Sequence, residues 1–432
     1  MKNIEIAKQI IQENWRDGFT VPSSKLYPFQ WMWDSGFVAL GTSTYDVKMS
    51  LTEIDKMFSG QWENGMIPHI LFHSEKEKTY FPNFDFWNSQ VNSGAPKFPK
   101  SSGITQPAVF GFILKDILQN HWGNQEVKDF VKKTYSKIVK YHNFLYTYRD
   151  PNQEGIFYIY HPWESGRDNS PLWDEALSKI EIKAGSIPNY ERRDTDIADA
   201  DERPTQDKYD RYVYLLELGK KYKYDGKEIG EESPFLIQDN MMNAILIKSN
   251  DSLIEIAHDL DLDSGQVSEW QALSRSNYDQ KFWNSSLDTY VGYDLRNEKQ
   301  INHREIGGII PLFAEIPDAV KASKINAYLK NLTKRGYFLC PSFDVDSPLF
   351  DSKRYWRGPI WPQMNWMIHE GLKSYGFDDT ANVIKSDFNT LVDKLGFHEY
   401  FEAGKQKAKA LTHGYGADRF SWTASSYIHL NK

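Results

Sequence analysis

Hydrophobic residues recur along most of the chain at the spacing of one helical face. In residues 4–15, Ile4, Ala7 and Ile11 fall on a single stripe, which predicts an amphipathic helix. The same spacing predicts further helices over residues 47–58, 107–118, 126–148, 209–223, 240–260, 267–283, 319–332, 363–375, 380–395 and 421–430. Strand-like patterns are short, and they cover residues 155–160, 289–293 and 335–339. The pattern therefore predicts an all-α protein.

Long segments rich in Gly, Pro, Trp and Asp separate the predicted helices. No Gly/Ser-rich or Pro-rich linker divides the chain, so we expect residues 1–432 to form a single domain. A succession of helices joined by long loops favours an α/α toroid, in which an inner and an outer ring bury a common core and the loops at one end build the site. The alternative is an irregular helical solenoid with a concave binding face. The insertions near residues 60–105 and 185–208 are expected to form a cap or lid.

Charge and cysteine content narrow the functional classes. The chain has 51 Lys and Arg residues against 59 Asp and Glu residues, a net charge of -8, which argues against nucleic acid as a partner. No apolar run reaches the length of a membrane span, and residues 1–6 lack the apolar core of a signal peptide. Cys340 is the only cysteine, so no intrachain disulfide forms and a cytoplasmic protein is expected. The sequence leaves open whether the chain forms a homo-oligomer.

Motifs of the commonest cofactor and metal chemistries are absent from the chain. It contains no G-x-x-x-x-G-K-[ST] loop and no G-x-G-x-x-G after a strand, so nucleotide binding is not expected. It contains no H-E-x-x-H, and one cysteine cannot build a thiolate cluster, so neither a metal nor a cofactor is expected. No G-x-S-x-G elbow is present either. Paired carboxylates remain as the candidate catalytic groups.

Two acidic segments lie among aromatic residues, which make up 15% of the chain and include 14 Trp. Sugars stack their C–H faces on such rings. Residues 163–171 place Glu164 and Asp168 near Trp163. A carboxylic acid that an aromatic wall desolvates keeps its proton near neutral pH, as the general acid of a glycosidase must. Residues 396–402 carry the second segment.

Spacing alone does not rank the acids within these segments. Glu164 competes with Asp168, and Glu402 competes with Glu399, while Asp34 follows Trp33 as a third acid beside an aromatic wall. An aromatic-rich helical toroid is also compatible with a sugar-binding protein that has no catalytic activity. An epimerase or isomerase is a further alternative, but that chemistry typically places histidines at the sugar ring.

Several segments resemble glycoside hydrolase family 63, in particular its bacterial branch of mannosylglycerate and glucosylglycerate hydrolases. They are residues 27–35, 65–69, 102–107, 163–171, 202–212, 354–361 and 420–424. The resemblance implies an (α/α)6 barrel and an inverting hydrolase of a small α-glucoside or α-mannoside. The implied substrate is glucosylglycerate or mannosylglycerate, which would yield the free sugar and glycerate. An α-glucosidase that acts on neutral gluco-oligosaccharides is the alternative.

The resemblance also implies roles for individual residues. Asp168 would be the general acid, and Glu399 would be the general base that activates water. The sugar would be held in the first subsite by Tyr27, Trp31 and Asp34, with Trp356, Gly358 and Trp361 lining it. Trp163 and Tyr355 lie in the same matching loops and are expected at the substrate. Glycerate would be held by Tyr80, Gln106, Arg203 and Tyr209.

Arg203 suits this role because a guanidinium binds a carboxylate through two parallel hydrogen bonds. The alternative for Arg203 is an ion pair with Asp201, Glu202 or Asp207. Two loops depart from the expected pattern of a site loop: residues 194–208 begin with an acidic run, and residues 402–410 are basic and helix-prone. The sequence leaves open whether these loops close over the substrate and exclude water.

Overall fold

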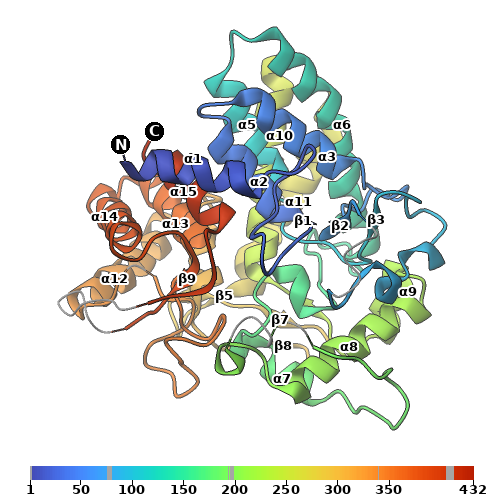
Figure 1. Ribbon diagram of the computed structural model, residues 1–432. Coiled ribbons are helices and arrows are strands. Elements are labelled where there is room, and N and C mark those ends of the chain that lie inside the picture. The colour runs from blue at the N-terminus through green and yellow to red at the C-terminus, as the bar shows by residue number, and fades with distance from the viewer. Residues whose placement is uncertain (1, 75–79, 193, 195–198, 339, 405–412) are drawn as a thin grey trace.

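The computed structural model is predominantly helical and describes residues 2–74, 80–192, 194, 199–338, 340–404 and 413–432. Figure 1 shows the arrangement of the helices. The long helices are α1 (Lys2–Asn14), α2 (Met32–Thr42), α3 (Val47–Phe58), α5 (Phe110–Asn120), α6 (Gln125–Tyr148), α8 (Gln206–Lys221), α10 (Asn240–Leu260), α11 (Gly265–Phe282), α12 (Ala319–Lys334), α13 (Pro362–Ser374), α14 (Asp378–Leu395) and α15 (Ser421–Leu430). Every helix predicted from the hydrophobic spacing is confirmed, with ends shifted by at most a few residues.

Several of these elements contact one another in a closed succession, and we name them the inner helices. Helix α2 packs on α5, α5 on α10, and α10 on the short 3-10 helix η7 (Ile310–Leu312). The succession continues from η7 to α13, from α13 to α15, and from α15 back to α2. The outer helices α1, α3 and α11 each pack against one inner helix, α6 packs against α5 and α10, α14 packs against α13 and α15, and α12 packs on α14. The two chain ends therefore meet, since α1 lies against α15 (Figure 1).

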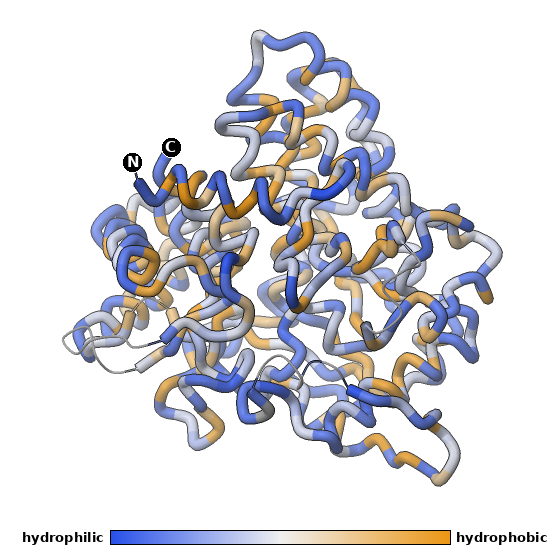
Figure 2. Tube along the Cα trace, in the orientation of Figure 1, coloured by the Kyte–Doolittle hydropathy of each residue, from blue (hydrophilic) through white to orange (hydrophobic). Residues whose placement is uncertain are grey.

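Inner and outer helices differ in hydropathy as their positions require. All residues of α2 and α15 are buried, whereas α14 mixes hydrophilic and hydrophobic residues and exposes its polar face (Figure 2). A helix that is buried all round has no amphipathic period. The hydrophobic spacing therefore predicts no helix over residues 32–42, where two glycines also weaken the helical preference; α15 is equally buried but contains no glycine. The structure adds α2 to the predicted helices.

Glycine permits close approach between neighbouring inner helices. A Cβ atom added to Gly41 of α2 would lie 2.6 Å from the Cα atom of Ser425 in α15, and one added to Gly111 of α5 would lie 2.1 Å from the Oγ atom of Ser249 in α10. Real atoms do not approach so closely. Small residues at these crossings bring the inner helices into backbone contact, which holds the loops at their ends in fixed positions.

Polar side chains cap several helices at their first residue. Asp46 accepts a hydrogen bond from the backbone N–H of Met49 at 3.0 Å at the start of α3, and Asp239 does the same with Met242 at 2.9 Å at the start of α10. Asp318 caps α12 through Lys321. Such caps satisfy N–H groups that have no partner within the helix.

The strands are short and lie in the long loops. A three-stranded antiparallel sheet joins β1 (Gln30–Trp31), β2 (Ile70–Phe72) and β3 (Lys100–Ser101). A hairpin pairs β9 (His398–Phe401) with β10 (Gly414–Asp418). The remaining strands are β4 (Ile237–Gln238), β5 (Trp283–Asn284), β6 (Thr289–Tyr290), β7 (Tyr293–Asp294) and β8 (Lys299–Gln300). The insertion at residues 60–105 contributes β2 and β3, so it joins the sheet that carries Trp31.

Two of the predicted strands are wrong. In residues 155–160 only Ile159 forms a bridge, with Ile237, because side chains take other backbone donors: Asn243 accepts from Phe157 N–H and Glu164 from Tyr160 N–H. Residues 335–338 end α12 in a turn with Gly336 at a left-handed φ of 85°, and Leu339 lies outside the described residues. The third prediction, residues 289–293, is confirmed in part by β6 and β7.

Three short helices were not predicted from the sequence: α4 (Phe84–Trp87), α7 (Asp174–Ser178) and α9 (Gly226–Glu232). Each is too short to display a hydrophobic period. Among the described residues, none of the helices has both the length and the apolar character that crossing a bilayer demands.

Candidate active site

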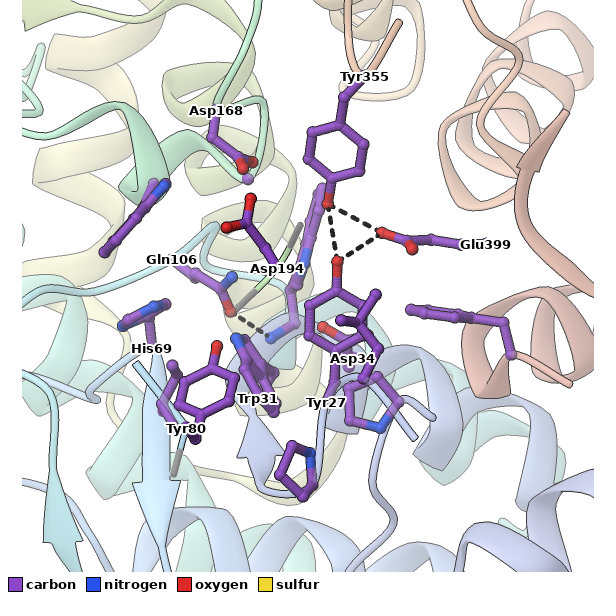
Figure 3. A pocket seen from close by; sticks show the side chains of 18 of the residues that line it. Tyr27, Trp31, Asp34, His69, Tyr80, Gln106, Asp168, Asp194, Tyr355 and Glu399 are labelled. Atoms are coloured by element: carbon purple, nitrogen blue, oxygen red, sulfur yellow. Dashed lines mark hydrogen bonds between the residues drawn. The ribbon is translucent and has the colours of Figure 1, made fainter. Parts of the chain in front are cut away.

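One cavity of about 490 Å³ is lined by most of the residues that the sequence analysis predicts at the substrate site. It lies where α2 and α15 begin, since Trp31 immediately precedes α2 and Phe420 immediately precedes α15. Residues that line it include Tyr27, Trp31, Asp34, Tyr80, Gln106, Trp163, Asp168, Arg203, Tyr209, Tyr355 and Glu399. Figure 3 shows Asp168 and Glu399 on different sides of this space, with Tyr355 and Tyr27 beside Glu399. The two acids that the resemblance paired therefore face the same cavity.

Asp168 is carried by a tight turn whose residues are suited to it. His161 caps the 3-10 helix η2 (Pro162–Ser165), accepting from Trp163 N–H at 3.0 Å. Gly166 then takes a left-handed φ of 67°, and a Cβ atom there would lie 2.5 Å from the ring of Trp33. Only glycine fits both requirements. The turn brings Asp168 to the cavity wall.

A buried cluster of charges fixes this turn from behind. Arg167 forms ion pairs with Asp239 and Glu305, and all three side chains are almost fully buried. The two acids also cap local helices, Asp239 at α10 and Glu305 at η6 (Ile306–Gly308). Tyr212 donates to the backbone oxygen of Asp168. The general-acid candidate is thus anchored to two helix ends through its neighbour.

Burial raises the pKa of Asp168 to about 7. The positive charge of Arg203 opposes this shift, and the negative charge of Glu399 adds to it. Apart from its own backbone N–H, no described residue donates a hydrogen bond to this carboxyl group. A carboxyl group without donors to its charged form keeps its proton near neutral pH.

Glu164, the competitor of Asp168, is not at the cavity. It is fully buried and forms an ion pair with Arg149 at 3.1 Å. Its oxygens also accept from Tyr160 N–H at 2.9 Å and from Thr105 N–H at 3.4 Å. With its acceptor sites occupied in this way, Glu164 stabilises the loop and leaves Asp168 as the acid that faces the substrate space.

Glu399 lies on strand β9 and is almost completely buried. The hydroxyl groups of Tyr355 and Tyr27 donate to its Oε1 atom at 2.9 and 3.0 Å, and the backbone N–H of Ala417 on β10 donates to Oε2 at 3.1 Å. Burial raises the pKa of Glu399, while Arg203 and these donors hold it down. Donors aimed at both oxygens stabilise the carboxylate form.

The neighbouring acid Glu402 accepts from Ser352 at 3.3 Å and does not line the cavity. Asp34 does line it, from the first turn of α2. Its Oδ1 atom is buried and receives no hydrogen bond from any residue that the structure describes. Burial and the charge of Glu399 raise the pKa of Asp34 well above its usual value. An unpartnered oxygen at a cavity wall is suited to accept from a ligand hydroxyl.

Arg203 reaches the cavity without an acidic partner among the described residues. Its Nη1 and Nη2 atoms donate to the hydroxyl of Tyr27, both at 3.2 Å. None of the three acids offered as alternative partners forms an ion pair with Arg203 in the described part of the chain: Glu202 accepts from Tyr400, Asp207 pairs with Arg211, and Asp201 is exposed.

The other residues expected at the glycerate end line the same cavity as Arg203. Gln106 accepts from Trp33 N–H at 3.2 Å through Oε1, which leaves its amide N–H groups for a ligand. Tyr80 packs edge-on against Trp31, with ring centroids 5.9 Å apart. Tyr209 packs edge-on against Trp163 at 6.0 Å. Aromatic rings and amide donors therefore line the cavity that Arg203 reaches.

Three predicted site residues do not line the cavity. Trp356 and Trp361 stack on each other at 3.8 Å between ring centroids and are fully buried behind Tyr355. Gly358 lies in the same loop, where a Cβ atom would meet the backbone oxygen of Asp351 at 2.3 Å. Trp361 packs edge-on against Tyr355 at 5.0 Å, so this group supports the tyrosine that binds Glu399.

Within the described residues, no group of three or more His, Cys, Asp or Glu side chains is arranged to hold a metal ion. Nucleotide motifs are missing from the sequence as well. The site places two carboxyl groups with contrasting hydrogen-bond environments among aromatic rings. Glycosidases use such a pair of carboxyl groups for catalysis.

Comparison with known families agrees with that geometry. The family described as "Mannosylglycerate hydrolase MGH1-like glycoside hydrolase domain" matches residues 27–423. The chain belongs to this family. It is a glycoside hydrolase, and the resemblance to glycoside hydrolase family 63 is confirmed.

Several similar proteins align with almost the whole length of this chain. Mannosylglycerate hydrolase of Thermus thermophilus is 37% identical over 97% of this chain and 98% of its own. Glucosylglycerate hydrolase of Mycolicibacterium hassiacum is 29% identical over 98% of this chain and 96% of its own. A crystal structure of a family 63 mannosylglycerate hydrolase from Thermus thermophilus, in complex with Tris and D-glycerate, has a TM-score of 0.92 and 36% identity and covers both chains fully.

The structure of this MGH1-like hydrolase also places unpredicted residues at the cavity. They include His69, Trp33, Asp194, Phe420 and Trp422. Four of them lie in segments that carry the family resemblance, which was the available signal; Asp194 had only its acidic loop. The Nδ1 atom of His69 lies 2.7 Å from the Oγ atom of Ser102, and burial lowers the pKa of His69 well below its usual value, so this imidazole is neutral.

Proposed function

We propose that this protein hydrolyses mannosylglycerate or glucosylglycerate with inversion at the anomeric carbon, which releases the sugar and glycerate. One observation carries the proposal: Asp168 and Glu399 line the same cavity in contrasting environments. Asp168 has a pKa of about 7 because it is buried without donors. Glu399 is held by three donors.

The proposed mechanism uses each carboxyl group once per turnover. Asp168 donates its proton to the glycosidic oxygen as the bond from that oxygen to the anomeric carbon breaks. Glu399 takes a proton from a water molecule that attacks the anomeric carbon from the opposite face. The two carboxyl groups are expected roughly 6.5–9.5 Å apart, which leaves room for this water.

Two further groups complete the proposal. Tyr27, Trp31 and Asp34 hold the sugar next to Glu399, and the stacked pair Trp356 and Trp361, with Gly358, supports that subsite through Tyr355. Asp34 accepts from sugar hydroxyl groups through its unpartnered oxygen.

The glycerate end is assigned to Arg203, Tyr80, Gln106 and Tyr209. A guanidinium without an acidic partner in the described part of the chain is suited to a substrate carboxylate. The similar Thermus structure, whose ligands include D-glycerate, supports a carboxylate site in this family. Of the two loops whose closure the sequence leaves open, residues 194–208 and 402–410, Asp194 lines the cavity, whereas residues 195–198 and 405–410 lie outside the described residues.

We also propose that the fold is an (α/α)6 barrel. The closed succession of inner helices supports this arrangement, with η7 in the place of one inner helix. Outer and inner elements alternate along the chain as α1–α2, α3–α5, α6–α10, α11–η7, α12–α13 and α14–α15. That alternation is expected of a single-domain toroid in which each outer helix leads to an inner one.

The test is a substrate panel read by released monosaccharide, followed by NMR of the fresh product. Mannosylglycerate and glucosylglycerate are expected to be cleaved, and kojibiose, nigerose and trehalose much more slowly. The first-formed sugar should be the β-anomer, because inversion converts an α-linkage. Equal rates on the neutral disaccharides would point to an ordinary α-glucosidase. An α-anomeric product would refute inversion, and binding without cleavage would indicate a sugar-binding protein.

A further inference from the structure

Arg203 lines the cavity and also contacts the residues that hold the candidate base Glu399. Both terminal nitrogens of its guanidinium lie 3.2 Å from the hydroxyl of Tyr27. That hydroxyl lies 3.0 Å from the Oε1 atom of Glu399. The guanidinium carbon also lies 4.7 Å from the ring centre of Tyr355, the second tyrosine that binds the same carboxylate. Arg203 therefore touches both tyrosines that hold the base.

Hydrogen-bond direction makes this contact specific. A guanidinium can only donate, so the oxygen of Tyr27 accepts from Arg203. The single hydroxyl proton of Tyr27 is then free to point away from the cation, toward Glu399. The 3.4 Å separation between the hydroxyl groups of Tyr27 and Tyr355 is the longest contact of the group, so both protons are directed at the carboxylate.

The backbone beside Arg203 is fastened to the same half of the site. Glu202 accepts from the hydroxyl of Tyr400 at 3.1 Å and from Gly416 N–H at 3.4 Å, and these residues belong to β9 and β10. Its backbone oxygen accepts from Tyr355 N–H at 3.1 Å. The segment that presents Arg203 is thus hydrogen-bonded to the hairpin that presents Glu399.

We propose that Arg203 is a positioning residue for the catalytic base, in addition to binding the substrate carboxylate, so that recognition of glycerate and activation of water share one guanidinium. This inference rests on the proposed function. It goes beyond substrate binding because it assigns Arg203 an effect on turnover of substrates that carry no carboxylate at all.

Electrostatics agree with this geometry. Arg203 lowers the pKa of Glu399 against the effect of burial. The ionisable groups that act on Glu399 are its neighbour Tyr400 on β9, Asp34 on α2, and Tyr27, Asp168, Arg203 and Tyr355 on the surrounding loops. Arg203 is the only cation in this set. Its removal should raise the pKa of Glu399 and move the acidic limb of the rate profile to higher pH.

Glycosyl fluorides separate the two roles of Arg203. α-Mannosyl fluoride and α-glucosyl fluoride have no glycerate, and fluoride departs without a proton from Asp168, so their hydrolysis reports on Glu399. We expect Arg203→Ala to lower kcat on the fluoride about 10- to 100-fold, the effect of losing a hydrogen bond to a charged group. Arg203→Lys should restore part of this kcat because it keeps the positive charge, but it should not restore glycerate recognition.

Arg354→Ala is the matched control. Arg354 donates to the backbone oxygen of Asp201, two residues from Arg203, and no hydrogen bond joins it to Tyr27 or Glu399 within the described chain. Its loss should leave fluoride hydrolysis unchanged. Thermal unfolding of each variant checks that the fold is intact. Tyr27→Phe interrupts the same link without removing the cation, and its effect on kcat should not add to that of Arg203→Ala.

The inference is overturned if Arg203→Ala hydrolyses the fluoride with the wild-type kcat and pH profile while it fails on the glycerate substrate. Additive effects of Arg203→Ala and Tyr27→Phe would also contradict it. Failure of the proposed function has a different signature: Glu399→Gln would retain fluoride hydrolysis, or the wild-type product would not be inverted.

Discussion

Asp168 and Glu399 are both desolvated, but they are held in opposite ways. Burial raises the pKa of both Asp168 and Glu399. Glu399 receives two hydroxyl donors and one backbone donor, whereas Asp168 has only its own backbone N–H. The number of donors, more than burial itself, therefore separates a proton donor from a proton acceptor in this cavity.

The supports of the two acids differ as well. Asp168 lies on a turn that is clamped by the buried ion pairs of Arg167. Glu399 lies on a hairpin whose backbone pairing fixes it, with Trp422 donating to its backbone oxygen at 3.0 Å. The acid depends on charge–charge contacts behind it, and the base depends on strand pairing. Mutations in the two supports should therefore have different effects.

The largest expected effect comes from neutralising each acid in turn. Asp168→Asn and Glu399→Gln should each lower kcat on the natural glycoside by about 10²- to 10⁴-fold, the usual contribution of general acid or base catalysis. On a glycosyl fluoride, which needs no proton from Asp168, only Glu399→Gln should remain slow. Steady-state kinetics on both substrates measures this. Near-normal turnover of the glycoside by Asp168→Asn would remove Asp168 from the mechanism.

The outer helices were predictable from the sequence, whereas two inner elements, α2 and the 3-10 helix η7, were not, for physical reasons. Amphipathic helices such as α3 and α14 show a 3.6-residue period because one face meets water. Helix α2 meets no water, and its sequence contains two glycines for close packing. Full burial removes the amphipathic period and the glycines weaken the helical preference of α2, whereas α15 is equally buried but has no glycine. The three residues of η7 are too few to show a period. Tertiary contacts, not local preference, define both elements.

Only some of the roles of the site residues could be predicted from the sequence. Sequence spacing left Glu164 and Asp168 equivalent, because nothing local indicates that Arg149, 15 residues before Glu164, would neutralise it. The family resemblance separated the two acids, and the ion pair in the structure explains the choice. Burial of Trp356 and Trp361 behind Tyr355 was equally invisible, since a string of aromatic residues does not state which ring faces the substrate.

The second-largest effect should follow from removing the clamp behind the acid. Arg167→Met leaves the carboxylates of Asp239 and Glu305 buried without a cation, which costs about 3–5 kcal/mol of unfolding free energy. Arg335→Met is the matched control, because its ion pair with Asp346 is exposed and such pairs contribute less than about 1 kcal/mol. Denaturant unfolding compares them. Equal losses would show that the clamp does not anchor the acid loop.

On the base side, Tyr355→Phe should reduce kcat by about 10- to 100-fold through loss of a hydrogen bond to a carboxylate. The donor lowers the pKa of Glu399, so its loss should also shift the acidic limb of the rate profile upward. Tyr375→Phe, which removes a hydroxyl bound to the backbone oxygen of Pro317 far along the chain, serves as control. A drop in kcat with an unmoved acidic limb would mean that Tyr355 acts on the sugar and not on the base.

The smallest expected effect is in the pH profile of the wild-type enzyme, which tests the contrast between Asp168 and Glu399 without a mutation. Asp168 must be protonated to act and has a pKa of about 7, so kcat/KM on the glycoside should fall about tenfold per pH unit above that value. The acidic limb should report Glu399, which must be ionised. Because fluoride leaves without general acid help, the alkaline limb should disappear with a glycosyl fluoride while the acidic limb stays. An alkaline limb that persists with the fluoride would assign that titration to a group other than Asp168, and the donor-count explanation would then fail for the acid half of the cavity.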